Sequence, residues 1–250
     1  MHRRLFAILL TFAVIAPASS AWAAAEVHRL SLVLSAAPSE IKGGDLNKNI
    51  DYINRNFLEN VGLEGLDNIT YGWLFDAELR YFVRPDWAIT AGVGQLKQQS
   101  EREYLPALQQ QVQIRQEILS VPVHIGGAYY FAPYNQGDFQ ARAFMGGGLL
   151  SLTLNRVTSQ VSNTIGTSSV TRINGSGPGF YGEGGVQMFF ASRFSVILSG
   201  MYRDAKTSNM LVTEGPADLL NQPALNSYAP TTYKLDASGL GFRLGIVFGL

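Results

Sequence analysis

The charged side chains with the greatest capacity for chemistry recur at every second position of their segments. Asp76, Glu78 and Arg80 are the clearest case, because a period of two puts all three on one face of a β-strand. Buried charges must pair, since an unpaired one is costly. Two interpretations therefore stay open: a structural network of salt bridges inside the fold, or a narrow polar path lined by the same residues. Equivalent positions in other alternating segments carry Arg142, Glu183, Arg203 and Arg243.

Catalytic and metal chemistry have little support. The chain has no cysteine, which excludes disulfides, thiolate catalysis and thiolate metal sites. Nucleophilic hydrolysis needs a serine beside a base with an acid behind it, but no His-x-Ser step and no G-x-S-x-G elbow occurs. Ser120 shares a strand face with His124, a spacing that is common by chance. We expect no enzyme activity, no cofactor and no metal site, with a lipid-modifying enzyme as the weakest alternative.

Eight segments that alternate in polarity are predicted to position these residues as β-strands. The polarity phase reverses after the glycines at 146–148, which predicts a β-bulge there. Pro122 removes one ladder hydrogen bond and so predicts a local irregularity in the fourth strand. The segments are Arg29–Ala36, Tyr71–Val83, Trp87–Lys97, Arg115–Phe131, Phe139–Arg156, Gly179–Phe190, Phe194–Asp204 and Lys234–Leu250.

The last segment has the most regular pattern. Every second residue from Leu240 to Leu250 is apolar, and most residues between them are glycine. A soluble sandwich or barrel would turn such a face inward. Because this strand follows a secretion signal and has seven partners like itself, we expect the apolar face to meet lipid.

The connections alternate in length, which is typical of transmembrane barrels built of up-and-down strands. Short turns are predicted near residues 84–86, 132–138 and 191–193, and long loops at 38–70, 100–114, 158–178 and 206–233. Aromatic residues gather at both ends of the strands, as at two lipid–water interfaces. About eight strands are expected, and ten stay open if loop segments pair.

Two of the long loops contain helical patterns. Residues Asp45–Val61 have apolar residues at helical spacing, with Asp45 as the expected N-cap and Gly62 as the expected stop. This amphipathic helix would cap the barrel mouth, lie on the membrane or bind a partner. A second helix is predicted at Glu101–Gln113, and the fourth loop, which contains three prolines, is expected to stay irregular.

The N-terminal residues predict export. Basic residues at Arg3 and Arg4 precede an apolar run, and Ala21-Trp22-Ala23 is a small-x-small cleavage site. We therefore assign 1–23 to a signal peptide and 24–250 to one barrel domain. The run is shorter than the ~20 residues that span a bilayer. Without Arg3 and Arg4, the 19 basic residues become 17 against 19 acidic ones, which argues against nucleic-acid binding.

On these alternating strands, the Val121-Pro122-Val123 step and the C-terminal pattern, the chain resembles the small eight-stranded outer-membrane β-barrels of the OmpA/OmpX type. The resemblance implies an all-β, antiparallel, monomeric transmembrane barrel in the outer membrane of a diderm bacterium, reached by Sec-type export. It also implies an insertion signal read by the barrel-insertion machinery. Family members usually end in an aromatic residue, whereas this chain ends in leucine. The signal residues would be Phe242, Leu244, Ile246, Phe248 and Leu250.

The resemblance and the charge pattern together predict a structural or surface-interaction role. The loops would face the cell exterior, and the charged network would fill the interior. Expected partners are outer-membrane lipids, the insertion machinery and an extracellular ligand bound through the long loops. The alternative function is a small channel for ions or hydrophobic solutes, as in OmpW-like barrels.

Overall fold

The computed structural model describes residues 28–104, 111–136, 139–163, 168–191, 193–214 and 233–250. The predicted signal peptide, 1–23, lies outside the described residues, as does most of the fourth predicted loop.

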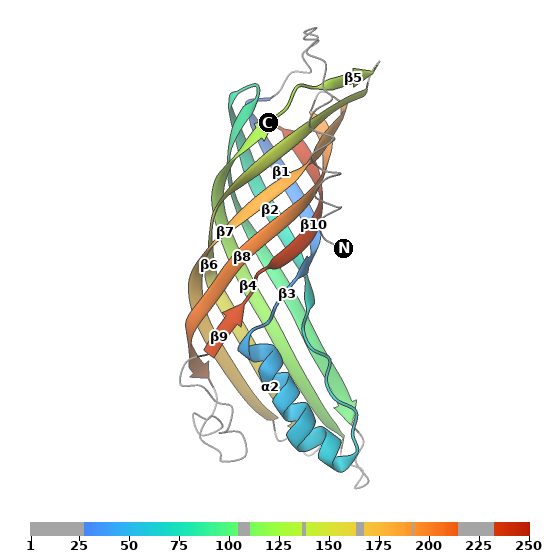
Figure 1. The fold of residues 1–250 in the computed structure, drawn as a ribbon, viewed down its shortest axis with the longest axis vertical. Helices are drawn as coiled ribbons and strands as arrows, with labels where there is room; N and C mark the ends of the chain where they lie inside the picture. Colours follow the sequence, from blue (N-terminus) through green and yellow to red (C-terminus); the bar gives the residue numbers. More distant parts are fainter. Residues whose placement is uncertain (1–27, 105–110, 137–138, 164–167, 192, 215–232) are drawn as a thin grey trace, which may run out of the picture.

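Eight long antiparallel strands form a closed ring (Figure 1). Each strand pairs with the next along the chain, and the last pairs with the first, as expected for an up-and-down barrel. Two short strands, β5 (Tyr134–Gln136) and β9 (Tyr233–Asp236), pair with β6 and β8 and bring the sheet to ten strands. The ring consists of β1 (Leu30–Glu40), β2 (Tyr71–Arg84), β3 (Trp87–Tyr104), β4 (Val112–Tyr130), β6 (Phe139–Asn163), β7 (Ser168–Ala191), β8 (Phe194–Glu214) and β10 (Gly239–Gly249).

The strand alternation predicted from the sequence divides the outside of the ring from its interior. Large apolar side chains point outward and are exposed, including Phe242 at 73% and Leu149 at 70%. Side chains at the intervening positions are buried, charged ones among them. Such an inverted arrangement, with apolar residues outside, is the one that lipid rather than water stabilises.

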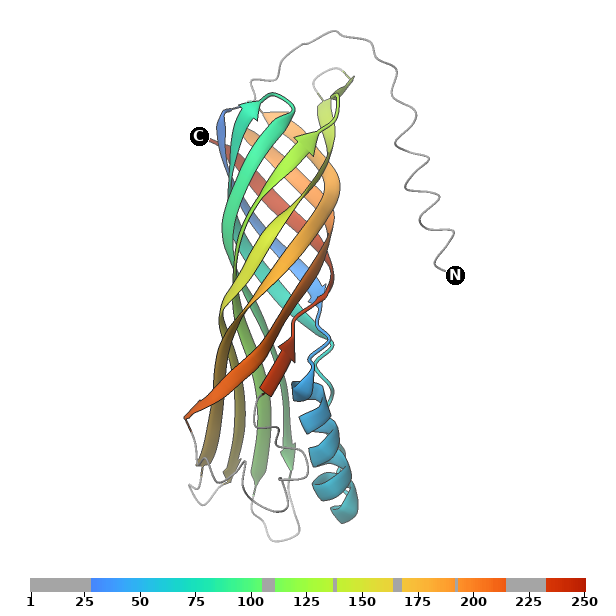
Figure 2. The ribbon, with the colours of Figure 1, turned by 60° about the vertical axis from the view of Figure 1, so that its left-hand side comes forward.

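The two ends of the ring differ, and we name them by their connections. The short-turn end contains the tight β2–β3 connection, the first residues of β1 and the last residues of β10. At the opposite end, which we call the hairpin end, β2 stops at Tyr71, while β3, β4, β6, β7 and β8 run on (Figures 1 and 2). Trp73 pairs with Lys97, for example, and β3 continues to Tyr104.

These extensions correct the prediction of long loops. Residues 101–104 and 112–113 belong to strands that pair with each other, so the predicted helix at Glu101–Gln113 is wrong for these residues. Residues 105–110 lie outside the described part. The outward residues of the extension are polar, with Gln99, Glu101 and Glu103 on β3, so the extension lacks the apolar outward face that marks the other strands in the sequence.

A helix fills the side of the hairpin end where β1, β2 and β10 have stopped (Figure 2). α2 (Asp45–Ile53) continues through a π-turn and a 3-10 turn to Val61 and ends at Gly62, which has a left-handed φ of 71°. The predicted helix and its stop are confirmed. The predicted cap is wrong, because Asp45 is already helical and its carboxylate accepts a hydrogen bond from the Lys234 N–H at 2.8 Å. In the described residues, no helix is both long and apolar enough to cross a membrane.

The β-bulge predicted at the glycines is wrong, because no register shift occurs there. Gly146–Gly148 pair in unbroken register with β4, because glycine lets the two backbones approach closely. The register shifts instead at Pro122, opposite Leu152–Leu154, which confirms the irregularity expected at the proline. Leu150 and Leu152 are therefore buried inside the ring, whereas a bulge at the glycines would have turned them to its apolar outer face.

Candidate functional site

The interior of the ring is layered. An apolar layer at the short-turn end contains Phe82, Tyr130 and Phe144, and the rings of Tyr130 and Phe144 stack with centroids 5.4 Å apart. A larger apolar core at the hairpin end joins strand residues such as Leu96 and Leu152 to the helix. The buried charges of β2 lie between these layers.

Five of the seven predicted interior charges meet in this middle layer, which we call the charged belt: Asp76, Glu78, Arg80, Glu183 and Arg243. Arg243 is its centre. Its Nη2 lies 2.9 Å from Asp76 Oδ2, and its Nη1 lies 3.1 Å from Glu183 Oε1 and 3.4 Å from Glu78 Oε2. Arg80 joins Glu78 through its Nε at 2.5 Å and approaches Glu183 at 3.6 Å.

Small residues on β1 and β10 leave room for the Arg243 guanidinium. Ser35 on β1 accepts a hydrogen bond from Arg243 Nε at 2.7 Å. The inward residues on either side of Arg243 along β10 are Gly241 and Gly245, which bring no side chain into the same space. The alternation of β10 therefore points the Arg243 guanidinium toward the carboxylates, and the two glycines leave space for it.

Polar side chains that the sequence analysis did not single out complete the belt. Tyr130 accepts a hydrogen bond from Arg80 Nη1 at 2.5 Å, and its hydroxyl donates to Gln187 at 3.1 Å. Ser199 donates to Glu183 at 2.5 Å. The only available signal was their inward position in the alternation, which they share with apolar residues.

His124 also faces the belt. Its Nε2 lies 3.5 Å from Asp76 Oδ1 and 3.9 Å from Glu78 Oε2, and the imidazole fits because the opposing residue is Gly92. The ligand atoms of these three residues lie within 4.8 Å of one another, a spacing that could hold a metal ion. A cation there would face Arg243, which already pairs with both carboxylates.

The other two predicted members of the network lie outside the belt, which corrects the expectation that all seven would pair. Arg142 is at the short-turn end, where its Nη2 donates to the Pro85 carbonyl at 2.8 Å and its guanidinium lies over the Tyr130 ring. Arg203 is on the hairpin side, where its Nε donates to the Ala237 carbonyl at 2.7 Å. Strand alternation determines whether a side chain points into the ring, but not its height, that is, its position along the barrel axis.

Outside the membrane-facing part, charges anchor the helix loop to the sheet. Arg102 on β3 pairs with Glu64 at 2.7 Å and with Asp67 at 3.7 Å, and the hydrogen bond to Glu64 raises the pKa of Arg102. Tyr104 donates to the Glu64 carbonyl at 2.8 Å, and burial raises the pKa of its hydroxyl. These contacts hold residues 62–70 against the extended edge of β3.

The solved structures that this chain resembles are distant from it in sequence. No curated protein matches the sequence. Among solved structures, the Ail protein of Yersinia pestis has 14% identity and a TM-score of 0.38, with 88% of this chain and 96% of Ail covered. OprG of Pseudomonas aeruginosa has 12% identity and a TM-score of 0.46, with 88% and 95% covered. The protease OmpT of Escherichia coli has 7% identity and a TM-score of 0.37, with 88% and 95% covered.

The family comparison extends over almost the whole chain. The model of the outer membrane protein beta-barrel domain matches residues 6–248, which include the helix and every strand of the ring except the last residue of β10. Together with the closed ring and its apolar outer face, this match shows that the chain belongs to the outer membrane protein beta-barrel domain family.

Proposed function

We propose that this outer-membrane barrel has a structural or surface-interaction role, with the hairpin end held outside the cell as a folded platform. The observation that carries the proposal is a change along the long strands: their outward-facing residues turn from apolar to polar while the strands themselves continue. On β3 the outward residues are apolar from Trp87 to Val93 and polar from Gln95 to Glu103. Since only the apolar part suits lipid, the remainder projects into water.

The neighbouring strand supports the same boundary. On β4 the outward residues Val123 and Ile125 are exposed and apolar, whereas Arg115 and Glu117 form an ion pair at 2.5 Å in the extension. Lys97 on β3 lies 3.4 Å from Glu117, so charged groups cover the sheet just beyond the lipid-facing part. A projecting sheet with a polar outer face is a surface on which binding functions are commonly built.

The alternative is a small channel for ions or hydrophobic solutes. The charged belt and the apolar layers on both sides of it fill the interior, as expected for a ring of eight strands. This filling supports a closed barrel over a conducting one. A lipid-modifying enzyme has no support in the described residues: the Ser120 hydroxyl has no hydrogen-bond partner, so it is not joined to His124.

The partners in this proposal are those expected from the sequence: outer-membrane lipids around the apolar face, the insertion machinery and an extracellular ligand at the hairpin end. The proposed insertion signal, Phe242 to Leu250, covers the outward face of β10 and the residue after it, and Phe242 and Leu244 are exposed. This face would be accessible to another protein before the barrel closes. The proposed barrel is a monomer because its ring is closed within one chain.

Planar-bilayer recording tests closure. Refolded protein is expected to give no defined conductance steps. Reproducible, selective steps that are lost on heat denaturation would favour the channel.

The surface role is tested separately with cells that express the full chain or a variant in which residues 99–117 are replaced by a two-residue turn. The trimmed variant is expected to keep the change in gel mobility on heating that marks a folded barrel. It should lose whatever surface adhesion and envelope resistance the full chain confers. Equal behaviour of both strains in these assays would contradict a role for the projecting sheet.

A further inference from the structure

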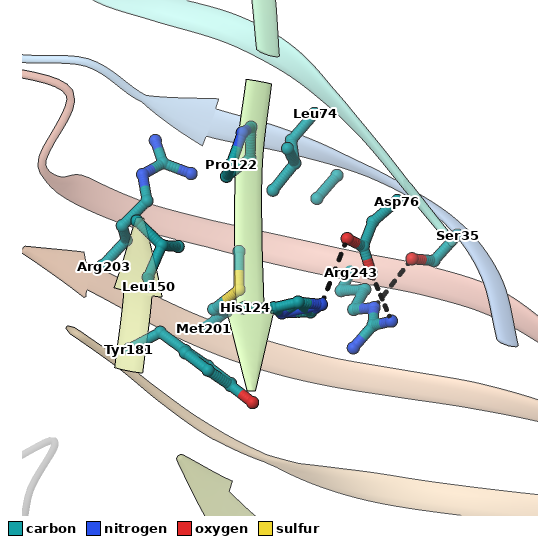
Figure 3. Close-up of a pocket in the computed structure, with 11 residues that line it drawn as sticks. Ser35, Leu74, Asp76, Pro122, His124, Leu150, Tyr181, Met201, Arg203 and Arg243 are labelled. Carbon is teal, nitrogen blue, oxygen red and sulfur yellow. Dashed lines mark hydrogen bonds and ion pairs between the residues drawn. The ribbon is translucent and has the colours of Figure 1, made fainter. Parts of the chain in front are cut away.

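Three exposed arginines lie at the short-turn end, and none of them has an ion-pair partner among the described residues: Arg29, Arg84 and Arg193. We call these three residues the arginine rim. The centre of the charged belt differs from them, because Figure 3 shows Arg243 joined to Asp76 and Ser35. The rim therefore presents three guanidiniums that the described part of the chain leaves available to a partner.

The arginine rim forms one continuous arc. The Phe82 N–H donates to the Arg29 carbonyl at 2.8 Å, which places the start of β1 beside the end of β2 and so beside Arg84. On the other side, the Gly249 N–H donates to the Arg193 carbonyl at 2.9 Å, and the end of β10 pairs with the start of β1. The arc thus extends from the β7–β8 turn, past the ends of β10 and β1, to the β2–β3 turn.

Acidic groups at this end do not balance the arc. In the described part of the chain, Asp86 is the only acidic residue at the short-turn end, and it interacts electrostatically with the buried Arg142. Even if Leu250 carries a free carboxylate, the arc has more positive than negative charge. Its counter-charge must therefore come from outside the described residues.

Two lysines at the opposite edge of the apolar face are paired instead. Lys97 lies 3.4 Å from Glu117, and Lys206 lies 3.3 Å from Asp204. Each of these cations has a carboxylate of its own chain as a neighbour. An anionic group therefore has less to gain from them than from the arginine rim.

The rim lies where lipid headgroups surround the barrel. Arg193 directly precedes Phe194, Arg84 pairs in register with Trp87, and both aromatic side chains are exposed. Exposed aromatic residues at the ends of barrel strands gather at the lipid–water interface. A guanidinium beside them meets the lipid phosphates, which it binds through charge-assisted hydrogen bonds. Phosphates of the surrounding lipids are therefore the anions nearest to the rim.

From these observations we propose that the arginine rim binds the headgroups of anionic phospholipids and enriches them around the short-turn end. Its excess of positive charge favours a headgroup with a net negative charge, such as phosphatidylglycerol, over zwitterionic phosphatidylcholine, since each basic residue at an anionic surface adds attraction. Assignment of these lipids to the periplasmic leaflet rests on the orientation proposed above. The binding of the lipid itself does not depend on that orientation.

Two tryptophans report on the two edges of the apolar face. Trp87 lies beside the rim, and Trp73 lies near the other end of β2. Replacement of Trp22 and Trp73 by phenylalanine leaves Trp87 as the only tryptophan, and replacement of Trp22 and Trp87 leaves Trp73. Brominated lipids quench tryptophan fluorescence on contact, so each single-tryptophan protein reports the lipids at one edge.

The test compares vesicles of phosphatidylcholine and phosphatidylglycerol in which one lipid or the other is brominated. Near Trp87, phosphatidylglycerol is expected to be enriched about fivefold over phosphatidylcholine at low salt, which is the attraction of about one basic residue. About 1 M NaCl should reduce the enrichment to less than about twofold, because salt screens exposed charges. Near Trp73, the two lipids should quench equally.

A variant with Arg29→Gln, Arg84→Gln and Arg193→Gln should lose the enrichment near Trp87. The proposal is overturned if both lipids quench Trp87 equally in the protein with an intact rim, or if the enrichment survives the loss of all three arginines. If the triple variant does not refold, the salt dependence decides, and an enrichment that persists in 1 M NaCl overturns the proposal.

The matched control removes three exposed basic residues at the hairpin end and so changes the net charge by the same amount. It should keep the full enrichment near Trp87, and an equal loss in both variants would contradict a role for the rim. Failure of the proposed surface role would leave these vesicle results unchanged, because no cell is involved. The control substitutions are Lys42→Gln, Arg55→Gln and Lys234→Gln.

Discussion

At the scale of single residues, Arg243 connects more of the interior than any other side chain described. It reaches three carboxylates on two strands, and Arg80 reaches two of these. A belt of three carboxylates and two guanidiniums already has more negative than positive groups. Removal of one guanidinium therefore leaves buried carboxylates facing one another without enough positive charge to hold them.

Arg243→Met should accordingly lower the free energy of unfolding by about 3–5 kcal/mol, the usual effect of breaking a buried ion pair from one side. The measurement is the urea midpoint at which the unheated sample loses its folded gel mobility. Arg84→Met, at an exposed position near the β2–β3 turn, is the control and should change the midpoint little. Equal midpoints for both variants would show that the belt contributes nothing to stability.

Gly92 is the residue that makes space for His124. A Cβ at this position would lie 2.1 Å from His124 Nε2 and 2.7 Å from the Ala77 carbonyl oxygen. Gly92→Ala should therefore destabilise the barrel by about 1–3 kcal/mol, because the backbone oxygen cannot move aside as a flexible side chain would. Gly200→Ala tests the same change where nothing lies within 4 Å, and it should leave the urea midpoint unchanged.

At the scale of elements, α2 replaces the strands that stop short. Leu46 and Ile50 are fully buried in the hairpin-end core, so the helix stabilises the extended sheet through its apolar face. The π-turn that continues the helix carries exposed residues such as Arg55 and Asn56 on its outer face. This is the arrangement of a helix that seals the side of the ring.

Ile50→Asp should release this helix while the ring stays folded, because a carboxylate at a fully buried apolar site must reach water. Trypsin should then cut after Lys48 or Arg55 at least about tenfold faster than in wild type, which corresponds to about 1.4 kcal/mol of lost local stability. Cleavage is located by mass spectrometry. Asn56→Asp puts the same group on the exposed face and should be cut at the wild-type rate. Slow cleavage of both variants would mean that the helix does not depend on its buried face.

The elements also show how far sequence reasoning reaches. Lipid-facing strands were predictable because their two faces differ strongly, as in Gly239–Gly249. The extensions were not, because Gln98–Tyr104 faces water on one side and has both polar and aromatic residues on the other. Pro122 located the register shift because a missing N–H has one structural consequence. A run of glycines is compatible with several structures, and here it allows close contact between strands and forms no bulge.

For the candidate site, the sequence could predict direction but not height. It placed all seven charges inside the ring, and all seven are at least largely buried. It could not show that Arg142 and Arg203 lie away from the belt, because height depends on how far each strand is displaced along its neighbours. The partners Tyr130 and Ser199 were not predictable, because their inward position is one that they share with apolar residues.

At the scale of the whole molecule, the position of the ring in the membrane can be measured directly because the chain has no cysteine. Any introduced thiol is then the only one. On β3, Val93 lies in the apolar part of the outward face, and Glu103 lies in the polar extension. Tyr134, on β5, is exposed at the short-turn end.

Single-cysteine variants at these three positions are treated with a membrane-impermeant maleimide on intact cells. Glu103→Cys should react, because the hairpin end projects into the medium. Tyr134→Cys should react only after the outer membrane is permeabilised, since the short-turn end faces the periplasm. Val93→Cys should react only after unfolding in urea, because lipid covers it. Reaction of Tyr134→Cys but not Glu103→Cys on intact cells would reverse the orientation. Ready reaction of Val93→Cys in the membrane would mean that lipid does not cover the apolar face of β3, which contradicts the boundary on which the proposed surface role depends.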